Sequence, residues 1–311
     1  MNIVFMGTPD FARDSLKLLV ESGHKISLVV TNPDKPKGRG MKLIPSDVKV
    51  YAENQGLEVE QPIKIKNNDE FVQKIKNINP DVICVVAYGK IIPKEILDIP
   101  RYGCINVHGS ILPKYRGAAP IQWAVLNGDK ETGVTTMFMA EGMDTGDMIL
   151  TEKIEIGDDE TTGEVWDRLS LIGAQLLVKT LEKIESGDYE RRKQGDDFTV
   201  APMINKEMAK IDWKKRTSLE IKNLVRGLNP FMGAFSYLNS KKIKLWKVQI
   251  LNKKFEAEPG EVIEANDKNG LTIATKDGAI SVIEIQGESS KKMNIKDFLR
   301  GNIITVGEKF E

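Results

Sequence analysis

The chain has 311 residues, of which 41% are hydrophobic and 29% are charged, and its formal net charge at pH 7 is zero. This length exceeds what one hydrophobic core usually holds, so two domains are expected in an otherwise ordinary soluble globular protein. No apolar run reaches the ~20 residues that a transmembrane helix needs, so no membrane partner is expected.

The beginning of the chain and its cysteines indicate a cytoplasmic protein. Residues 1–5 enter an apolar strand pattern directly, without the basic segment, apolar stretch and cleavage site of a secretory signal. The two cysteines, Cys84 and Cys104, lie in apolar runs and are predicted to be buried, reduced thiols. No cysteine cluster suggests a metal site, so no metal is expected, and no obligate protein partner is expected either.

The N-terminal part alternates between strand and helix patterns. Short apolar runs are expected as strands at 3–5, 26–30, 82–86, 105–108 and 134–139, and longer amphipathic stretches as helices at 10–22 and 162–186. This alternation predicts an α/β fold with a Rossmann-like, doubly wound parallel sheet, which binds ligands at the carboxyl ends of its strands.

The pattern changes after residue 188. Residues 189–205 are polar and are predicted to form a linker between a catalytic domain at 1–188 and a second domain at 206–311. A helix is expected there at 218–227, followed by strands at 235–238, 242–247, 260–265, 270–275 and 279–286. Five short strands separated by turns predict a small β-barrel of the oligonucleotide-binding (OB) type.

Charge is distributed unevenly between these parts. From Lys206 to the end there are 20 Lys and Arg against 14 Asp and Glu, a surplus of six positive charges, and the first 205 residues carry the matching surplus of six negative charges. Lys242 and Lys244 alternate with apolar residues and so share one face of a strand. This distribution is typical of a protein with a polyanionic partner.

The clearest chemical signal is Asn106-Val107-His108 at the end of an apolar strand. Asn106 and His108 project to the same face, where an α/β sheet presents catalytic groups. Asp144 lies in a glycine-flanked loop after the strand at 134–139 and can reach His108 if the two strands are neighbours. His108 can then accept a proton, Asn106 can stabilise an oxyanion, and Asp144 can orient the imidazole. These three groups suit acyl transfer to an amine.

Several motifs resemble the folate-dependent formyltransferases. The signature consists of residues 106–113 with 115–121, and it is supported by the N-terminal motif at 5–11 and the aspartate loop at 143–147. The resemblance covers nearly the whole chain and is strongest to the members that act on initiator tRNA. It implies a Rossmann-like domain followed by an OB-like barrel. The implied reaction moves a formyl group from 10-formyltetrahydrofolate to the amino group of methionyl initiator tRNA in the cytoplasm.

The resemblance also implies site residues. Asn106, His108 and Asp144 match the family's catalytic positions. The folate site is expected to include two neighbouring segments and one acidic residue of the aspartate loop. These residues are Ser110, Ile111, Leu112 and Pro113, then Tyr88, Gly89, Lys90 and Ile91, and finally Glu141.

A basic loop at 32–43 follows the second expected strand. It contains Lys35, Lys37, Arg39 and Lys42, with Arg39 between two glycines. On composition alone this is a solvated loop. By the resemblance it is an arm that grips the acceptor end of tRNA, with Arg39 as the main contact and the lysines on phosphates.

Alternative functions remain open on the residues alone. The same Asn, His and Asp would serve a formyltransferase with another acceptor, such as glycinamide ribonucleotide or an amino sugar, or a 10-formyltetrahydrofolate hydrolase. A nicotinamide-dependent oxidoreductase is disfavoured, because residues 7–12 lack the second and third glycines of G-x-G-x-x-G. A tRNA-binding module without catalysis would leave the three polar residues without a purpose.

Overall fold

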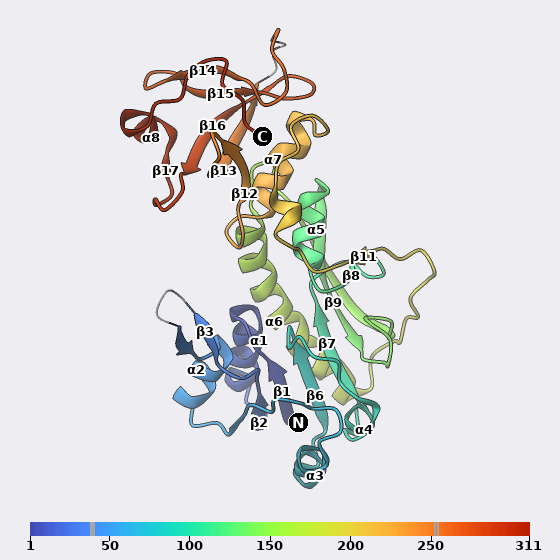
Figure 1. The fold of residues 1–311 in the computed structure, drawn as a ribbon. Coiled ribbons are helices and arrows are strands. Elements are labelled where there is room, and N and C mark those ends of the chain that lie inside the picture. Colours follow the sequence, from blue (N-terminus) through green and yellow to red (C-terminus); the bar gives the residue numbers. More distant parts are fainter. Residues whose placement is uncertain (38–40, 252, 254) are drawn as a thin grey trace. The chain divides into compact units, whose positions relative to one another are not determined.

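The computed structural model describes residues 1–37, 41–251, 253 and 255–311 (Figure 1). Contacts divide these residues into two compact units. Unit 1 contains 1–120, 131–155 and 166–202, and unit 2 contains 121–130, 156–165 and 203–311. Four boundaries between the units thus fall inside what the sequence suggests is the first domain, and the expected boundaries at residues 188 and 206 stay a prediction.

A seven-stranded sheet forms the centre of unit 1, in the order β10-β9-β7-β6-β1-β2-β5. The strands span β1 Asn2–Gly7, β2 Lys25–Val30, β5 Val59–Glu60, β6 Val82–Val86, β7 Cys104–His108, β9 Glu131–Phe138 and β10 Met148–Glu155. β5, β2, β1, β6 and β7 run parallel, whereas β9 runs antiparallel to both β7 and β10. The predicted parallel, Rossmann-like sheet is confirmed in these five strands, and β9 departs from it.

The reversal at β9 has a topological reason. Neighbouring parallel strands need a crossover connection, which usually places a helix on the sheet. The helix between β7 and β9 is α5 (Pro120–Leu126), and residues 121–130 belong to unit 2. The connection therefore supplies no covering helix to the sheet of unit 1, and β9 enters the sheet antiparallel.

Helices cover both faces of this sheet (Figure 1). One face buries apolar residues of β1, β2 and β6 under α3 (Asp69–Ile78) and α4 (Lys94–Leu97). On the other face lie α1 (Asp10–Glu21) and α6 (Thr162–Ser186), close to the predicted helices. A Cβ on Gly173 of α6 would lie 3.1 Å from Val107 and 3.4 Å from Val134, so the glycine permits close contact with β7 and β9.

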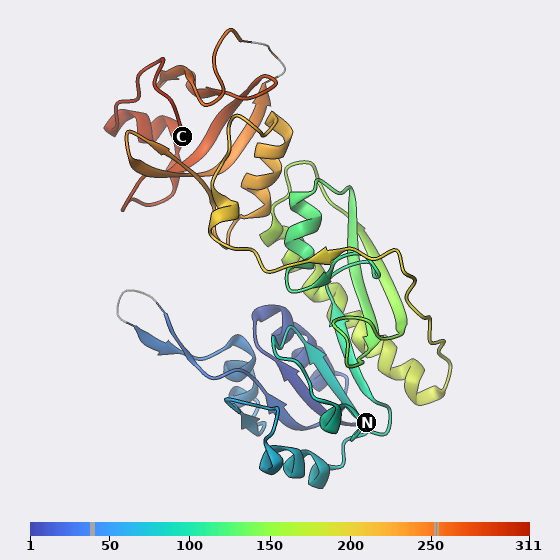
Figure 2. The ribbon, with the colours of Figure 1, turned by 45° about the vertical axis from the view of Figure 1, so that its right-hand side comes forward.

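Smaller elements complete unit 1. A two-stranded antiparallel hairpin, β3 (Lys35–Lys37) with β4 (Lys42–Ile44), precedes α2 (Asp47–Asn54), and Figure 2 shows it beside α2 and outside the central sheet. β8 (Arg116–Gly117) pairs in parallel with β11 (Val200–Ala201).

Unit 2 contains an antiparallel sheet, in the order β12-β13-β16-β15-β14, with β17 paired to β16. The elements span η1 Glu207–Ala209, α7 Ser218–Gly227, β12 Ala234–Leu238, β13 Lys241–Leu251, β14 Val262–Asn266, β15 Gly270–Ala274, β16 Ala279–Gln286, β17 Met293–Asn294 and α8 Ile295–Gly301. The predicted helix and all five predicted strands are present.

The C-terminal segment joins the two edges of this sheet. Glu311 and Tyr237 of β12 exchange backbone hydrogen bonds of 2.8 and 2.9 Å. On the other side, the Val262 N–H donates to the Glu308 carbonyl at 2.8 Å and the Phe310 N–H donates to the Gly260 carbonyl at 2.8 Å. The tail thus connects β12 to β14, which gives the barrel-like arrangement that the sequence predicts. Trp213 is buried in the core of this unit and donates to the Ser236 hydroxyl at 2.9 Å.

Candidate active site

The end of β7 carries the predicted catalytic pair. Cys104, Asn106 and His108 lie on one face of the strand, and Val107 faces α6 on the other. Cys104 belongs to the apolar cluster under α3 and α4, whereas Asn106 and His108 are the polar continuation of the same face. Both are nearly buried, with exposed fractions of 9% and 5%. The strand therefore places an amide and an imidazole side by side in a largely dry environment.

The amide of Asn106 makes no hydrogen bond within the part of the chain that the structure describes. Its polar atoms keep some contact with solvent, because the fully buried side-chain N and O atoms without a partner in the described chain are the Ser15 and Tyr88 hydroxyl oxygens. Asn106 is thus available to donate a hydrogen bond to an oxygen bound beside His108.

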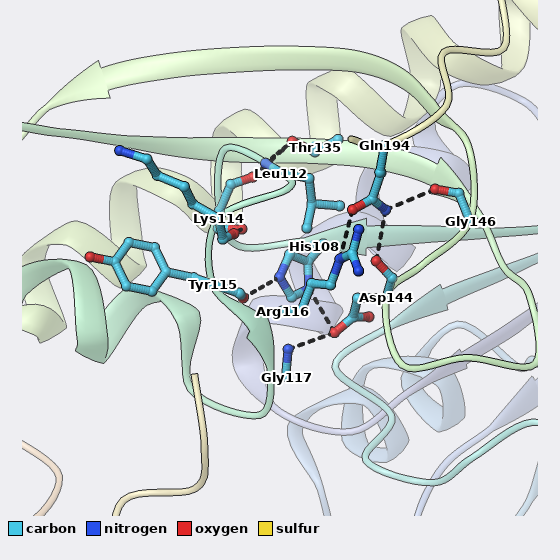
Figure 3. Close-up of polar contacts among 11 residues, drawn as sticks. His108, Leu112, Lys114, Tyr115, Arg116, Gly117, Thr135, Asp144, Gly146 and Gln194 are labelled. Atoms are coloured by element: carbon cyan, nitrogen blue, oxygen red, sulfur yellow. Dashed lines mark hydrogen bonds and ion pairs between the residues drawn. The ribbon is translucent and has the colours of Figure 1, made fainter. Parts of the chain in front are cut away.

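His108 is held between two loops (Figure 3). Its Nε2 lies 2.9 Å from the backbone carbonyl oxygen of Tyr115. Since a carbonyl can only accept, the neutral ring in this orientation carries its proton on Nε2 and leaves Nδ1 as the basic nitrogen. Nδ1 faces Oδ2 of Asp144 at 3.7 Å, which is too long for a hydrogen bond and short enough for an ion pair with the protonated ring.

Asp144 is fixed by the Gly117 backbone and the Gln194 side chain rather than by His108. Its Oδ2 accepts a hydrogen bond of 2.8 Å from the Gly117 N–H. Gln194 donates to the Asp144 and Gly146 carbonyl oxygens at 2.7 and 2.8 Å. The backbone of Asp144 is left-handed, with φ of 52°, a conformation that a non-glycine residue adopts only when its surroundings enforce it. The sequence-predicted trio is therefore brought together, with Asp144 supplied by a constrained loop.

The route by which Asp144 reaches His108 differs from the expected one. Because β9 is antiparallel to β7, Phe138 pairs with Ile105, and the end of β9 lies near the beginning of β7. The loop that follows must fold back along the sheet before β10 begins at Met148. The expectation that the two strands are neighbours is correct, but their carboxyl ends do not meet.

The expected folate segment at 110–113 lies beside this trio. The Ser110 hydroxyl donates to the Lys114 carbonyl at 2.6 Å, and the Thr135 hydroxyl of β9 donates to the Ser110 carbonyl at 2.8 Å. Leu112 is buried, Ile111 and Pro113 are half-buried, and the Leu112–Pro113 peptide bond is cis. These hydrogen bonds fix the position of the segment next to His108.

The second expected folate segment follows β6. The Tyr88 side chain is buried in the core, where burial raises its pKa to about 12, and its hydroxyl has no partner within the described chain. Gly89 has φ of 76°. The Lys90 ammonium donates to the Pro62 and Ile63 carbonyls at 2.6 and 3.0 Å, and burial lowers its pKa. The Tyr88 ring therefore belongs to the core of unit 1.

Three of the expected folate residues, Gly89, Ile91 and Glu141, are exposed. Ile91 is 82% exposed, and Glu141 is exposed with its carboxylate 4.0 Å from the Lys94 ammonium.

The basic segment is a hairpin rather than an irregular loop. Lys35 and Lys37 lie on β3 and Lys42 on β4, and Lys35 is exposed. Arg39 lies outside the described residues. The hairpin is tethered at its base, where Asp34 accepts hydrogen bonds of 2.8 Å from both Lys49 and Gln61. This anchoring holds the pKa of the Asp34 carboxyl below its usual value.

The sequence does not predict the roles of several residues at the site. Tyr115 and Gly117 act through backbone groups, which leave no side-chain signature, and Gln194 lies in the segment predicted to be only a linker. Positive φ at Tyr115 and Gly117, 62° and 121°, makes these carbonyl and amide directions possible. The glycine at position 117 is the one sequence signal for this left-handed backbone.

Comparisons with known proteins show the family of the chain. The Formyl transferase family matches residues 1–181, and its C-terminal domain matches residues 203–302. The chain is 49% identical over 308 residues to "Methionyl-tRNA formyltransferase" of Caldanaerobacter subterraneus and 48% identical over 312 residues to that of Ruminiclostridium cellulolyticum. In both cases 99% of each chain is covered.

Solved structures share the fold at low identity. An N-formyltransferase from Helicobacter canadensis, in complex with folinic acid and dTDP-3-aminofucose, has a TM-score of 0.66 at 22% identity and covers 92% of this chain and 99% of its own. HypX from Aquifex aeolicus, in complex with tetrahydrofolic acid, has a TM-score of 0.66 at 19% identity. That match covers 96% of this chain and 46% of the HypX chain.

Fold, site and comparisons together define a formyl transferase, and therefore an enzyme of the transferase class. Within that class the chain belongs to the methionyl-tRNA formyltransferase family. In the described parts of the chain, no cluster of three or more His, Cys, Asp or Glu residues is arranged to hold a metal ion, and no helix is long and apolar enough to cross a membrane.

Proposed function

We propose that this chain transfers the formyl group of 10-formyltetrahydrofolate to the free amino group of methionyl initiator tRNA. The observation that carries the proposal is the convergence of an unpartnered Asn106 amide, the His108 imidazole and the Asp144 carboxylate in unit 1. Family membership adds the reaction class and the acceptor.

The proposed mechanism assigns one role to each residue. Asn106 donates a hydrogen bond to the formyl oxygen as it gains negative charge during attack by the amine. His108 accepts the proton that the attacking nitrogen loses, at Nδ1, because Nε2 is committed to the Tyr115 carbonyl. Asp144 stabilises the resulting imidazolium across 3.7 Å. The bond from the formyl carbon to the folate nitrogen then breaks, and that nitrogen takes up the proton.

The folate site in this proposal lies between the segments at 88–91 and 110–113, with Glu141 at its rim. Left-handed backbone at Ala87 and Gly89, with φ of 44° and 76°, turns peptide groups of the first segment away from a regular strand. Asn32 fixes this turn, because its Nδ2 donates to the Tyr88 carbonyl at 2.6 Å. Peptide groups presented in this way suit a pterin ring, whose edge carries donors and acceptors.

The tRNA contacts in this proposal are basic residues in both units. Lys35, Lys37, Arg39 and Lys42 of the hairpin segment would bind the acceptor end, with Arg39 as the main contact. In unit 2, the Lys242 ammonium lies 3.6 Å from the centre of the Phe235 ring, on the outer face of β13. The surplus of positive charge after residue 205 favours the same partner. The proposal places the reaction in the cytoplasm and needs no other protein.

The competing acceptors are tested by one assay. The protein is incubated with 10-formyltetrahydrofolate and each of three acceptors: methionyl initiator tRNA, methionyl elongator tRNA and a nucleotide-linked amino sugar. The esterified amino acid or the sugar is then analysed for formylation. We expect formyl transfer to the initiator tRNA, and transfer only to the sugar, or release of formate without transfer, would refute the proposal.

The role of His108 is tested in the same assay. Proton transfer by a positioned imidazole contributes about 10²–10⁴-fold, so His108→Ala should lower the single-turnover rate by that factor while leaving tRNA binding nearly unchanged. His24→Ala is the matched control, because His24 is the only other histidine and lies at the N-terminal end of the chain. An unchanged rate in His108→Ala would rule out proton transfer by this residue.

A further inference from the structure

A short segment after α6 brackets both loops of the active site. Residues 191–201, here termed the strap, bind the aspartate loop at their beginning and the loop at 115–119 at their end. The Arg191 Nε donates to the Asp147 carboxylate at 2.9 Å, and Arg192 exchanges backbone hydrogen bonds of 2.8 and 2.9 Å with Met148. At the other end, the Arg116 N–H donates to the Thr199 carbonyl at 2.8 Å, and β11 pairs with β8.

Gln194 is the strap residue whose side chain touches both loops (Figure 3). Its Nε2 donates to the carbonyl oxygens of Asp144 and Gly146 at 2.7 and 2.8 Å. Its Oε1 accepts from the Arg116 Nε at 2.9 Å. Both amide hydrogens and one oxygen acceptor position are therefore used within the protein, so the side chain has no donor left for a substrate.

From this geometry we infer that Gln194 is a positioning residue for formyl transfer, which sets the place of the Asp144 carboxylate beside His108. The inference rests on the proposed function and extends it to a residue of the strap. Asp144 has a left-handed backbone, which the chain adopts only where other contacts hold it. The two hydrogen bonds from Gln194 clamp the carbonyl groups at and just after that position.

The other loop completes the link. Arg116, held by Gln194 and by the Phe198 ring 4.4 Å from its guanidinium carbon, lies between the two residues that contact the catalytic groups. Before it, the Tyr115 carbonyl accepts from His108, and after it, the Gly117 N–H donates to Asp144. A single amide thus ties together the loop that orients the imidazole and the loop that carries the carboxylate.

Two substitutions distinguish the donor contacts of Gln194 from its acceptor contact. Gln194→Ala removes all of them. Gln194→Glu keeps the acceptor for Arg116 and replaces the two N–H donors by an oxygen facing the Asp144 and Gly146 carbonyls, which repel it. We expect both variants to lower kcat by about 10²-fold, the size of effect that a misplacement of about 1 Å produces. The KM values for tRNA and for 10-formyltetrahydrofolate should stay within about threefold, since the Gln194 amide hydrogens are already donated within the protein.

The decisive measurement is a double-mutant cycle with Asp144→Asn, in single-turnover assays. If Gln194 acts through the carboxylate, Gln194→Ala should reduce the rate by less than about threefold once Asp144 has been replaced. Asp197→Asn, on the exposed part of the strap, is the control and should retain the wild-type rate. Thermal unfolding of each variant shows whether the fold is retained, and Gln194→Glu serves if Gln194→Ala does not fold.

The outcomes are distinguishable. A wild-type kcat in both Gln194 variants, a rise in KM without a fall in kcat, or an equal loss with and without the Asp144 carboxylate would each overturn the inference. If the unmodified protein transfers no formyl group to any acceptor, the proposed function fails and the inference fails with it.

Discussion

Asn106 and His108 owe their chemistry to where the apolar face of β7 ends. Cys104, two residues before Asn106, is packed under α3 and α4, and burial raises the thiol pKa to about 12, so it is an inert core residue. Asn106 and His108 extend the same face beyond the helices and remain nearly buried. In the proposed mechanism, the amide of Asn106 donates a hydrogen bond to the formyl oxygen.

This view of Asn106 gives a prediction for the chemical step. Removing one preorganised donor from an oxyanion site typically costs about 10²–10³ in kcat, and we expect a loss of this size for Asn106→Ala. Asn106→Asp should be no better, because a carboxylate opposes the developing negative charge. The single-turnover rate is the measurement. Cys104→Ala, on the same face of β7, is the control, and comparable losses in both variants would show that the effect is on packing rather than on catalysis.

At the scale of elements, the active site depends on loops that secondary structure holds in place. The aspartate loop follows β9, which runs antiparallel to β7. The strap connects this loop to the loop at 115–119. In unit 2, the elements are held by local devices instead. The clearest is the capping box of α7, in which Thr217 accepts from the Glu220 N–H and Glu220 accepts from the Thr217 N–H.

The capping box predicts an effect on stability. Thr217→Ala should lower the free energy of unfolding of unit 2 by about 1 kcal/mol, because the helix loses the partner of an otherwise unpaired N–H. Thr217→Ser retains the hydroxyl and should cost much less. Denaturant unfolding followed by the fluorescence of Trp213 and Trp246 in a background without the other two tryptophans measures this. Equal stability of all three proteins would show that the cap contributes nothing.

The same box predicts a pH dependence. Hydrogen bonds from the backbone and hydroxyl of Thr217 hold the pKa of the Glu220 carboxyl below its ordinary value of 4.5. A carboxyl whose pKa is lower in the folded state contributes stability above its unfolded pKa and loses it as pH falls through the folded one. The stability of Glu220→Gln should therefore decline less than that of the wild type as pH is lowered below about 4.5. Parallel declines would contradict this.

At the scale of the whole molecule, the two proposed substrates are expected to bind segments that differ in charge. Excess positive charge after residue 205 and the basic hairpin segment suit a nucleic acid, whereas the proposed folate segments at 88–91 and 110–113 hold a single charged residue, Lys90. Binding to phosphates releases counterions and weakens steeply with salt, whereas binding of a small, mainly hydrogen-bonded ligand does not. The affinities for the two substrates should thus respond differently to ionic strength.

We expect Lys35→Ala and Arg39→Ala to weaken tRNA binding and to reduce the slope of log K against log salt. Each lost phosphate contact should reduce the slope by about 0.7–0.9. Folate binding should stay unchanged in both variants. Lys153→Ala is the control, because its ammonium is paired with Glu131 at 2.9 Å. Equal weakening of tRNA and folate binding would mean that the hairpin segment has a structural role and does not contact tRNA.

The sequence alone determined the fold class, the chemical types at the site and the most strongly periodic elements. Helices α6 and α7 and strand β16 begin and end at the predicted residues, because hydrophobic periodicity is a local property of the chain. Asn106, His108 and Asp144 were recognisable because side chains that do chemistry stand out where a strand pattern ends. The tertiary structure decided the direction of β9, the tautomer of His108 and the part played by Gln194. These depend on backbone carbonyls and N–H groups brought together from residues far apart in the chain, and such groups are the same in every residue.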